Sequence, residues 1–105
     1  MRNALQFLSK NQNSKIKTGL YKHYKGNHYF VLGSAKHSET LEDMVIYQSM
    51  YKSAEFGDFA TWIRPLSMFL ETVEVDGQQI QRFTSLGDEE TIKFEKQFLH
   101  LMSKG

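Results

Sequence analysis

The chain has 105 residues, a formal net charge of +1 at pH 7 and no cysteine. This length corresponds to one domain, the missing cysteines exclude a disulfide framework, and no segment approaches the ~18 consecutive apolar residues of a membrane span. The first residues also lack an apolar stretch long enough for a secretory signal. We therefore expect one soluble domain in the cytoplasm.

The first part of the chain predicts a short extension followed by an aromatic hairpin. Residues 1–17 contain one or two turns of amphipathic helix and a polar linker. The chain then becomes rich in aromatic residues on both sides of Gly26 and Asn27, which favour a tight turn because both residue types accept a positive φ. A two-residue loop at this point would place Tyr24 opposite Tyr29.

Two more strands and a second hairpin follow. Segments 44–51 and 59–65 are rich in β-branched and aromatic residues, and the only proline ends the second of them. Residues 66–69 are too few for a longer helix and suit a single 3₁₀ turn. Asp76 and Gly77 then give a strong turn signal for a hairpin.

The last segment, residues 88–104, gives the clearest helix signal. Acids occupy its first turn, where the helix dipole favours negative charge. Its apolar residues recur at spacings of three, four and seven, which predicts a packed face. They are Ile92, Phe94, Phe98, Leu99, Leu101 and Met102. This face would close the end of a barrel, pack on residues 4–8, or form a homodimer contact.

These elements predict a mainly β fold, a small SH3-like barrel of about five strands over residues 18–84. An OB-like barrel is the other fold that fits the pattern. The extension at residues 1–17, with its helical turn, and the C-terminal α-helix region at residues 85–105 lie outside this domain.

Charge is distributed unevenly along the chain. Residues 1–38 contain seven Lys and Arg and no acid, whereas residues 39–105 contain six basic and twelve acidic residues. Such a split marks a nucleic-acid-binding face or is neutralised within the fold, and the small net charge favours neutralisation. The nucleic-acid alternative would use lysines interleaved with aromatic rings. These lysines are Lys15, Lys17, Lys22, Lys25 and Lys36.

The stretch KHSETLED carries the densest group of polar residues. One interpretation is a strand-to-strand turn whose hydroxyls bond nearby backbone amides. The other is a ligand-binding corner in which a histidine titrates near neutral pH beside a carboxylate. The candidate residues of this corner are His37, Glu39, Thr40 and Glu42.

The segment WIRP carries the second candidate. In a strand, Trp62 and Arg64 share one face and Ile63 points to the other, so Ile63 would belong to the core. Arg64 would then pair bidentately with Glu39, Glu42 or another acid. Alternatively, an exposed Trp62 beside Arg64 would form a binding surface. Both interpretations stay open.

Metal and nucleophilic chemistry find little support in the sequence. His23, His28, His37 and Glu39 are suitable ligand types, but their spacing matches no compact zinc pattern. The chain has no thiol, no G-x-S-x-G motif and no phosphate-binding glycine loop. We therefore expect no metal and no cofactor, and a small metal-assisted hydrolase is the least favoured function.

Several of these motifs resemble a bacterial domain-of-unknown-function family, DUF1653. The family pattern combines G-x-Y-x-H-Y-K-G, H-S-E-T-x-E, V-x-Y, W-x-R-P-x-x-M-F and R-F. The matching residues are Gly19, Tyr21, His23, Tyr24, Lys25 and Gly26, then His37, Ser38, Glu39, Thr40 and Glu42, then Val45 and Tyr47, then Trp62, Arg64, Pro65, Met68 and Phe69, and finally Arg82 and Phe83. The resemblance implies a compact bacterial β domain over about residues 19–83. It implies no activity, and it adds Arg82 to the candidate site residues.

Together these patterns favour a non-catalytic binding or interaction module over an enzyme. We expect one polar surface with Trp62 as its floor, formed by His37, Glu39, Thr40, Glu42, Arg64 and Arg82. Its partner would be a protein or a small molecule, and nucleic-acid binding through the basic hairpin is the first alternative. The protein would be a monomer or a homodimer formed through its C-terminal helix.

Overall fold

The computed structural model describes residues 14–104, with side chains placed up to residue 100. The helical turn expected near the N-terminus lies outside the described residues. The predicted class, mainly β with a C-terminal α-helix, is confirmed. In chain order the elements are β1 (Gly19–His23), β2 (His28–Lys36), β3 (Asp43–Ser49), β4 (Thr61–Pro65), α2 (Leu66–Phe69), β5 (Thr72–Val75), β6 (Gln78–Gln81), β7 (Phe83–Ser85) and α3 (Gly87–Lys104).

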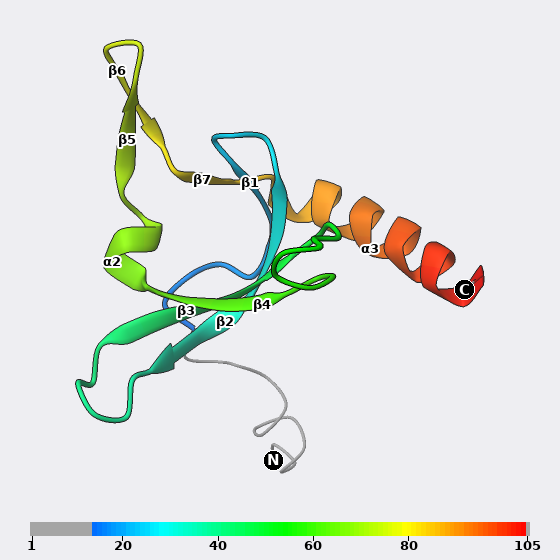
Figure 1. The fold of residues 1–105 in the computed structure, drawn as a ribbon, viewed down its shortest axis with the longest axis horizontal. Coiled ribbons are helices and arrows are strands. Elements are labelled where there is room, and N and C mark those ends of the chain that lie inside the picture. Colours follow the sequence, from blue (N-terminus) through cyan, green and yellow to red (C-terminus); the bar gives the residue numbers. More distant parts are fainter. Residues whose placement is uncertain (1–13, 105) are drawn as a thin grey trace.

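Five strands form one antiparallel sheet in the order β4-β3-β2-β1-β7, while β5 and β6 form a separate pair. Among the described strands this sheet is open, because its edge strands β4 and β7 do not pair with each other. The prediction of a closed barrel is therefore wrong, and an SH3-like fold is not confirmed. The chain between the two edges forms α2 and the β5–β6 hairpin, and this hairpin projects away from the sheet instead of closing it (Figure 1).

The first hairpin has a longer loop than the sequence suggested. Its strands pair Tyr21, not Tyr24, with Tyr29, so the expected register is wrong. The backbone of His23 closes the loop by two hydrogen bonds of 2.8 Å each. The Tyr24 N–H instead donates to the carbonyl of Arg82, 2.9 Å away and just ahead of β7. This bond brings Arg82 against the end of β1, a contact that local turn rules cannot anticipate.

The second hairpin and α2 follow more closely from their local sequence. Asp76 and Gly77 have positive φ angles of 52° and 80°, as a type I′ turn requires. Pro65 precedes α2 with a φ of −53°, close to the helical value. However, α2 is an α-helical turn and not the predicted 3₁₀ turn, because the Leu70 N–H donates to the carbonyl of Leu66 over 3.0 Å.

The core lies on one face of the five-stranded sheet, here called the inner face, and consists mainly of aromatic rings. Phe69 of α2 is 1% exposed and stacks on Phe83 of β7, with ring centroids 4.1 Å apart. Tyr47 of β3 meets these two rings edge to face at 5.4 and 5.6 Å. Such pairs stabilise a core beyond the area that they bury. The buried members of this cluster are Tyr21, Val31, Val45, Tyr47, Phe69 and Phe83.

Helix α3 packs on the opposite, outer face of the sheet, so it covers a sheet face and not the end of a barrel. Leu20 of β1 is 4% exposed on this side, and its N–H donates to the Thr91 Oγ1 of α3 over 3.0 Å. The ring of Phe98 meets Phe59 edge to face at 5.5 Å. The acids expected in the first helical turn are found there.

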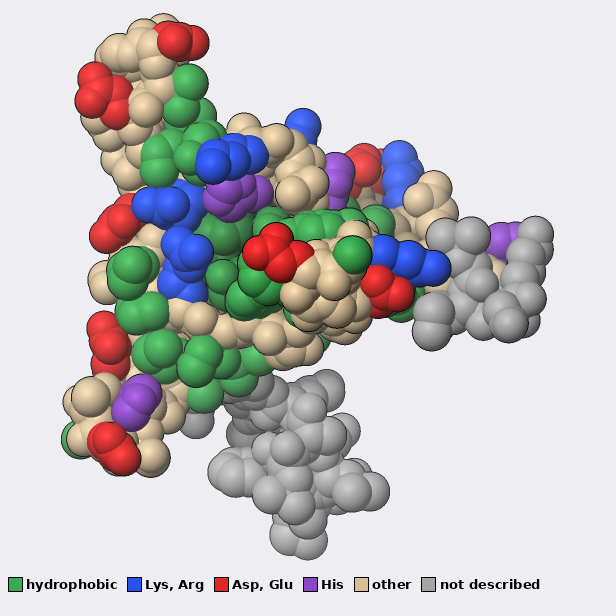
Figure 2. Space-filling view, viewed as in Figure 1, with side chains coloured by type: hydrophobic (Ala, Val, Ile, Leu, Met, Phe, Trp, Pro, Cys, Tyr) green, Lys and Arg blue, Asp and Glu red, His purple; other side chains and the backbone are tan. Residues whose placement is uncertain are grey.

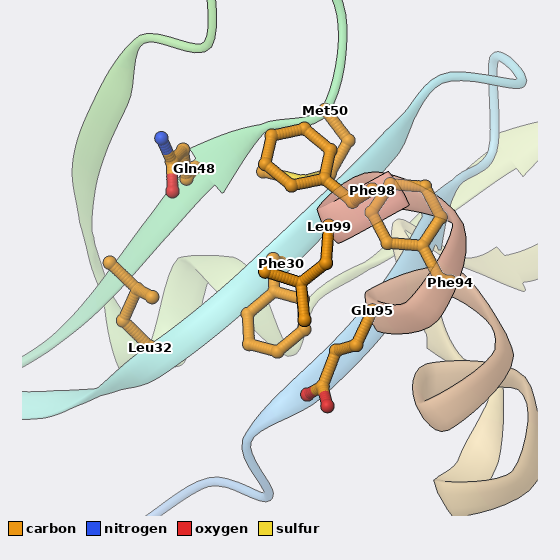
Figure 3. A pocket seen from close by; sticks show the side chains of 8 residues that line it. All are labelled: Phe30, Leu32, Gln48, Met50, Phe94, Glu95, Phe98 and Leu99. Atoms are coloured by element: carbon orange, nitrogen blue, oxygen red, sulfur yellow. The ribbon is translucent and has the colours of Figure 1, made fainter. Parts of the chain in front are cut away.

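An apolar groove of about 350 Å³ remains between α3 and the sheet (Figure 3). In Figure 3 the helix residues Phe94 and Phe98 lie near Phe30 and Met50, whereas Leu32 and Gln48 lie farther along the open sheet. Leu99 also lines the groove and is 68% exposed. A homodimer contact through α3 stays a prediction, and the alternative contact with residues 4–8 falls outside the described residues.

Candidate functional site

The corner at residues 37–42 is a turn held together by its own polar side chains. The His37 Nδ1 accepts the N–H groups of Glu39 and Thr40, at 3.2 and 3.3 Å. The Thr40 Oγ1 accepts the Glu42 N–H at 3.2 Å. The carboxylates of Glu39 and Glu42 belong to exposed residues, and neither forms an ion pair within residues 14–100. The polar groups of this corner therefore complete a turn.

Arg64 lies away from this corner, on the inner face of β4. It pairs with Val45 of β3, and its Nε donates to the Tyr47 Oη over 3.3 Å. Along β3, Tyr47 is two residues farther from the corner than Val45. The Arg64 side chain therefore extends away from His37, and the structure does not bring the corner and Arg64 together.

Trp62 shares the inner face with Arg64, as the strand period predicted, but it is half-buried. Its Nε1 donates to the Ser49 Oγ over 2.8 Å, and its ring meets Phe56 edge to face at 5.2 Å. Ile63 points to the outer face and is 65% exposed, so the prediction that Ile63 belongs to the core is wrong. The reason is that the ring-lined face of this strand is the one that packs on the core.

The guanidinium group of Arg64 lies over the core without an acid partner. Its Cζ is 5.8 Å from the centroid of the Phe83 ring, and the residue is half-buried. It forms no ion pair with any acid of the described chain. A charge withdrawn from water is unfavourable unless it is paired. The expected pairing of Arg64 with Glu39, Glu42 or another acid is therefore absent from this part of the chain.

The hydrogen-bond donors of Arg82 are also only partly paired among the described atoms. Its Nη2 contacts the Glu71 Oε2 at 3.4 Å, a long ion pair whose carboxylate is half exposed. Its Nε is buried and has no hydrogen-bond partner among the described atoms. A buried donor without a partner is uncommon and costs free energy, so it calls for an explanation.

His23 lies against the same ring as Arg64. Its ring meets Phe83 edge to face at 4.9 Å, and its Nδ1 accepts the Lys25 N–H over 3.2 Å. Burial lowers the pKa of His23 from its ordinary 6.5, and so do three neighbouring cations, Arg82, Lys25 and Arg64. Neutral His23 then carries its proton on Nε2, because Nδ1 acts as an acceptor.

Arg64, Arg82 and Lys25 together form what we call the cationic cluster. Figure 2 shows Lys and Arg side chains and a histidine gathered beside the hydrophobic middle of this view, below the β5–β6 hairpin. Among the described residues, Glu71 is the one acid that pairs with a member of the cluster. The cluster is therefore a local excess of positive charge next to a neutral histidine.

Tyrosine hydroxyl groups lie near the cluster. The hydroxyls of Tyr29 and Tyr51 are hydrogen-bonded at 2.7 Å, and the Tyr29 ring meets that of His23 at 6.2 Å. Burial, followed by the bond to Tyr51, raises the pKa of Tyr29 far above its ordinary value of 10. Tyr29 thus stays a neutral phenol, which can donate a hydrogen bond without adding charge.

The lysines of the nucleic-acid alternative do not form one platform. Lys17 pairs with Asp88 at 3.2 Å, and Lys36 pairs with Asp43 at 3.0 Å. The expected internal neutralisation is thus found for these two residues. None of the four rings expected to stack bases is an exposed residue, and these rings are Tyr21, Tyr24, Tyr29 and Phe30. The arrangement gives little support to stacking of single-stranded bases.

Neither a metal centre nor a membrane span is found in the part of the chain that the structure describes. Within residues 14–104 no three His, Asp or Glu side chains gather closely enough to hold a metal ion. No helix of this segment has the length and apolar character to cross a membrane.

Comparison with known proteins places the chain in a family. The model of a protein family of unknown function, DUF1653, matches residues 19–85. The chain belongs to the DUF1653 family. Its structure is similar to the crystal structure of a DUF1653 protein from Bordetella bronchiseptica, with a TM-score of 0.62, 36% sequence identity, and coverage of 70% of this chain and 90% of that chain. No curated protein matches the chain significantly.

The DUF1653 match includes the whole cationic cluster and His23, whereas α3 begins after it. Sequence reasoning selected Arg64 and Arg82 as candidates but missed His23 and Lys25 as their neighbours. The DUF1653 pattern G-x-Y-x-H-Y-K-G contains both residues, and this signal could have found them. The family description names no activity, so the site itself is the guide to function.

Proposed function

We propose that the protein is a non-catalytic binding module that holds an acid group of its ligand on the cationic cluster. The observation that carries this proposal is Arg64, a half-buried residue whose guanidinium group pairs with no acid of the described chain. Its Nε is engaged by Tyr47. The two terminal nitrogens can therefore bind two oxygens of one acid group side by side, as Arg commonly does.

The energetics of the cluster support a partner from outside the described chain. A cation over an aromatic ring gains about 0.5–1 kcal/mol when exposed and about 2 kcal/mol when desolvated, so Phe83 compensates Arg64 only in part. The long contact of Arg82 with Glu71 likewise leaves its Nε without a partner among the described atoms. An acid group on the ligand would supply the negative charge that Arg64 lacks among the described residues. The module would thus bind a protein or a small molecule that presents such a group.

An amide NMR titration tests this proposal. The ¹⁵N-labelled protein is titrated with acetate and with sulfate at constant ionic strength, and we expect shifts centred on the amides of His23, Arg64 and Arg82. Arg64→Gln should lower the affinity for both anions at least about tenfold, because it removes the charge and the bidentate donor. Arg64→Lys keeps the charge but not the geometry, and should recover the affinity only in part.

Lys96→Gln is the matched control. It removes one positive charge from an exposed residue of α3 that forms no ion pair in the described part of the chain. Its affinity for the anions should stay within about twofold of wild type, because salt screens charges at that distance. A folded Arg64→Gln protein that binds both anions as tightly as the Lys96→Gln protein would refute the proposal.

A further inference from the structure

We infer that the acid group bound by the cationic cluster is a phosphate monoester, an inference that rests on the function proposed above. The first support is the charge of the site. The cluster contributes three positive charges and Glu71 contributes one negative charge, which leaves two positive charges unbalanced. A phosphate monoester carries about −1.5 to −2 at pH 7, whereas a carboxylate or a phosphate diester carries only −1.

The second support is the number and direction of the donors. Arg64 extends from β4, at one edge of the sheet. Arg82 is the residue just ahead of β7, the strand at the other edge. His23 lies at the end of β1, against the Phe83 ring that Arg64 also covers. One guanidinium fork engages both oxygens of a planar carboxylate from one side, whereas the three terminal oxygens of a phosphate monoester accept from several directions.

The third support is that His23 supplies a donor without a charge. Its Nδ1 accepts the Lys25 N–H, so the neutral ring keeps its proton on Nε2. The charged groups that act on His23 are Arg82, Lys25 and Arg64. The titratable rings beside it include Tyr24 at 4.6 Å and Tyr29 at 6.2 Å, and burial keeps Tyr29 neutral. The unbalanced charge therefore stays the same near neutral pH. Near neutral pH the two unbalanced positive charges therefore match a dianion, and no charge on His23 is needed.

A phosphate diester, the unit of a nucleic-acid backbone, fits these features less well. It offers two free oxygens and one charge, and a backbone would need further cations along its path. Two further lysines of the basic segment, Lys17 and Lys36, lie elsewhere on the molecule and are engaged with acids. The site thus has the charge and the donors for one isolated terminal phosphate.

The test is a set of NMR titrations with methyl phosphate, dimethyl phosphate, acetate and sulfate at constant ionic strength. Near neutral pH, methyl phosphate should bind at least about tenfold more tightly than dimethyl phosphate and acetate, because it has one more charge and one more acceptor oxygen. Lowering the pH to about 5 should lower the affinity for methyl phosphate several-fold, since its second pKa is about 6. Sulfate keeps its charge over this range, so its affinity should not fall.

One variant and two further ligands complete the test. Lys25→Gln changes an exposed residue of the loop, and it should weaken methyl phosphate about threefold or more while leaving the fold intact. Phosphoserine and a phosphoserine peptide then distinguish a small-molecule source from a protein source. Tighter binding of either one agrees with the inference.

The possible failures are separable. Equal affinities for methyl phosphate and acetate would overturn the phosphate inference while leaving an acid-binding module. Equal affinities for methyl and dimethyl phosphate would overturn it in favour of a diester backbone. No shift with any of the four anions would overturn both the inference and the proposed function.

Discussion

Replacing Thr91 by valine should weaken the attachment of α3 to the sheet. The Thr91 Oγ1 accepts the N–H of Leu20 at 3.0 Å and donates to the Gly87 carbonyl at 2.7 Å. Leu20 is buried. Just past the end of β7 the Leu86 N–H donates to the Leu20 carbonyl over 3.0 Å, while the Leu20 N–H is bonded to Thr91. Valine has nearly the same shape as threonine but no oxygen. The buried N–H of Leu20 would therefore lose its partner.

The size of the effect follows from that single amide. A buried donor without a partner costs about 1–3 kcal/mol, and the helix propensities of threonine and valine are similar. Thr91→Ser is the matched control, because it keeps the hydroxyl and removes only a methyl group. We expect the valine variant to be less stable than the serine variant by about 1 kcal/mol or more. That difference corresponds to roughly 4–8 °C in Tm for a domain near this size.

Urea unfolding measures the global effect, and amide hydrogen exchange measures the local one. In the valine variant, exchange at the Leu20 amide should accelerate about tenfold or more, while the serine variant should keep its protection. Equal unfolding midpoints for the two variants, with unchanged exchange at Leu20, would show that this hydrogen bond does not hold the helix. The reasoning about α3 would then be wrong.

Three other predictions concern the core and the pH dependence of stability. Phe69→Ala should cost about 3–5 kcal/mol in urea unfolding, whereas exposed Leu70→Ala should cost less than about 1 kcal/mol; similar losses would contradict the assigned core. Ser49→Ala should cost about 1–3 kcal/mol, because it leaves the Trp62 indole N–H unpaired, and an unchanged urea midpoint would argue against that bond. The lowered pKa of His23 means that its contribution to stability is present above pH 6.5 and is lost as the pH falls through the lower folded value. Urea midpoints measured on both sides of pH 6.5 should therefore fall less in His23→Gln than in wild type, and equal falls would exclude His23 as the cause.

The parts of the fold that depend on a few neighbouring residues could be predicted from the sequence. Asp76 and Gly77 set their hairpin because both adopt positive φ within one turn. The start of α3 followed from its acidic first turn. By contrast, the loop of the first hairpin is longer than expected, since Tyr24 bonds to Arg82, far along the chain. The prediction of a closed barrel was wrong for the same reason. Closure depends on whether β4 and β7, which are separated along the chain, pair with each other.

The candidate site was predictable in its residue types but not in its arrangement. The sequence selected Arg64 and Arg82 as candidate polar residues, yet the alternation of a strand does not say which face is the core. The wrong assignment of Ile63 came from that ambiguity, since an aliphatic side chain is expected inside and a tryptophan beside an arginine outside. The corner around His37 was ambiguous for another reason, because the groups that complete a turn are the same groups that bind ligands.

The amino-acid composition did not predict the cationic cluster, because it reports the charge of the whole chain and not the local charge of the inner face. The chain carries twelve acids and thirteen Lys and Arg residues, so its net charge is close to zero. Acids are paired with Lys17 and Lys36 elsewhere on the molecule, whereas Arg64 lies over the aromatic core with no acid partner among the described residues. A fold that needed only stability would gain more from an apolar residue at that position, because an unpaired half-buried charge costs free energy. The proposed ligand would bring the missing negative charge and would thereby account for the arginine.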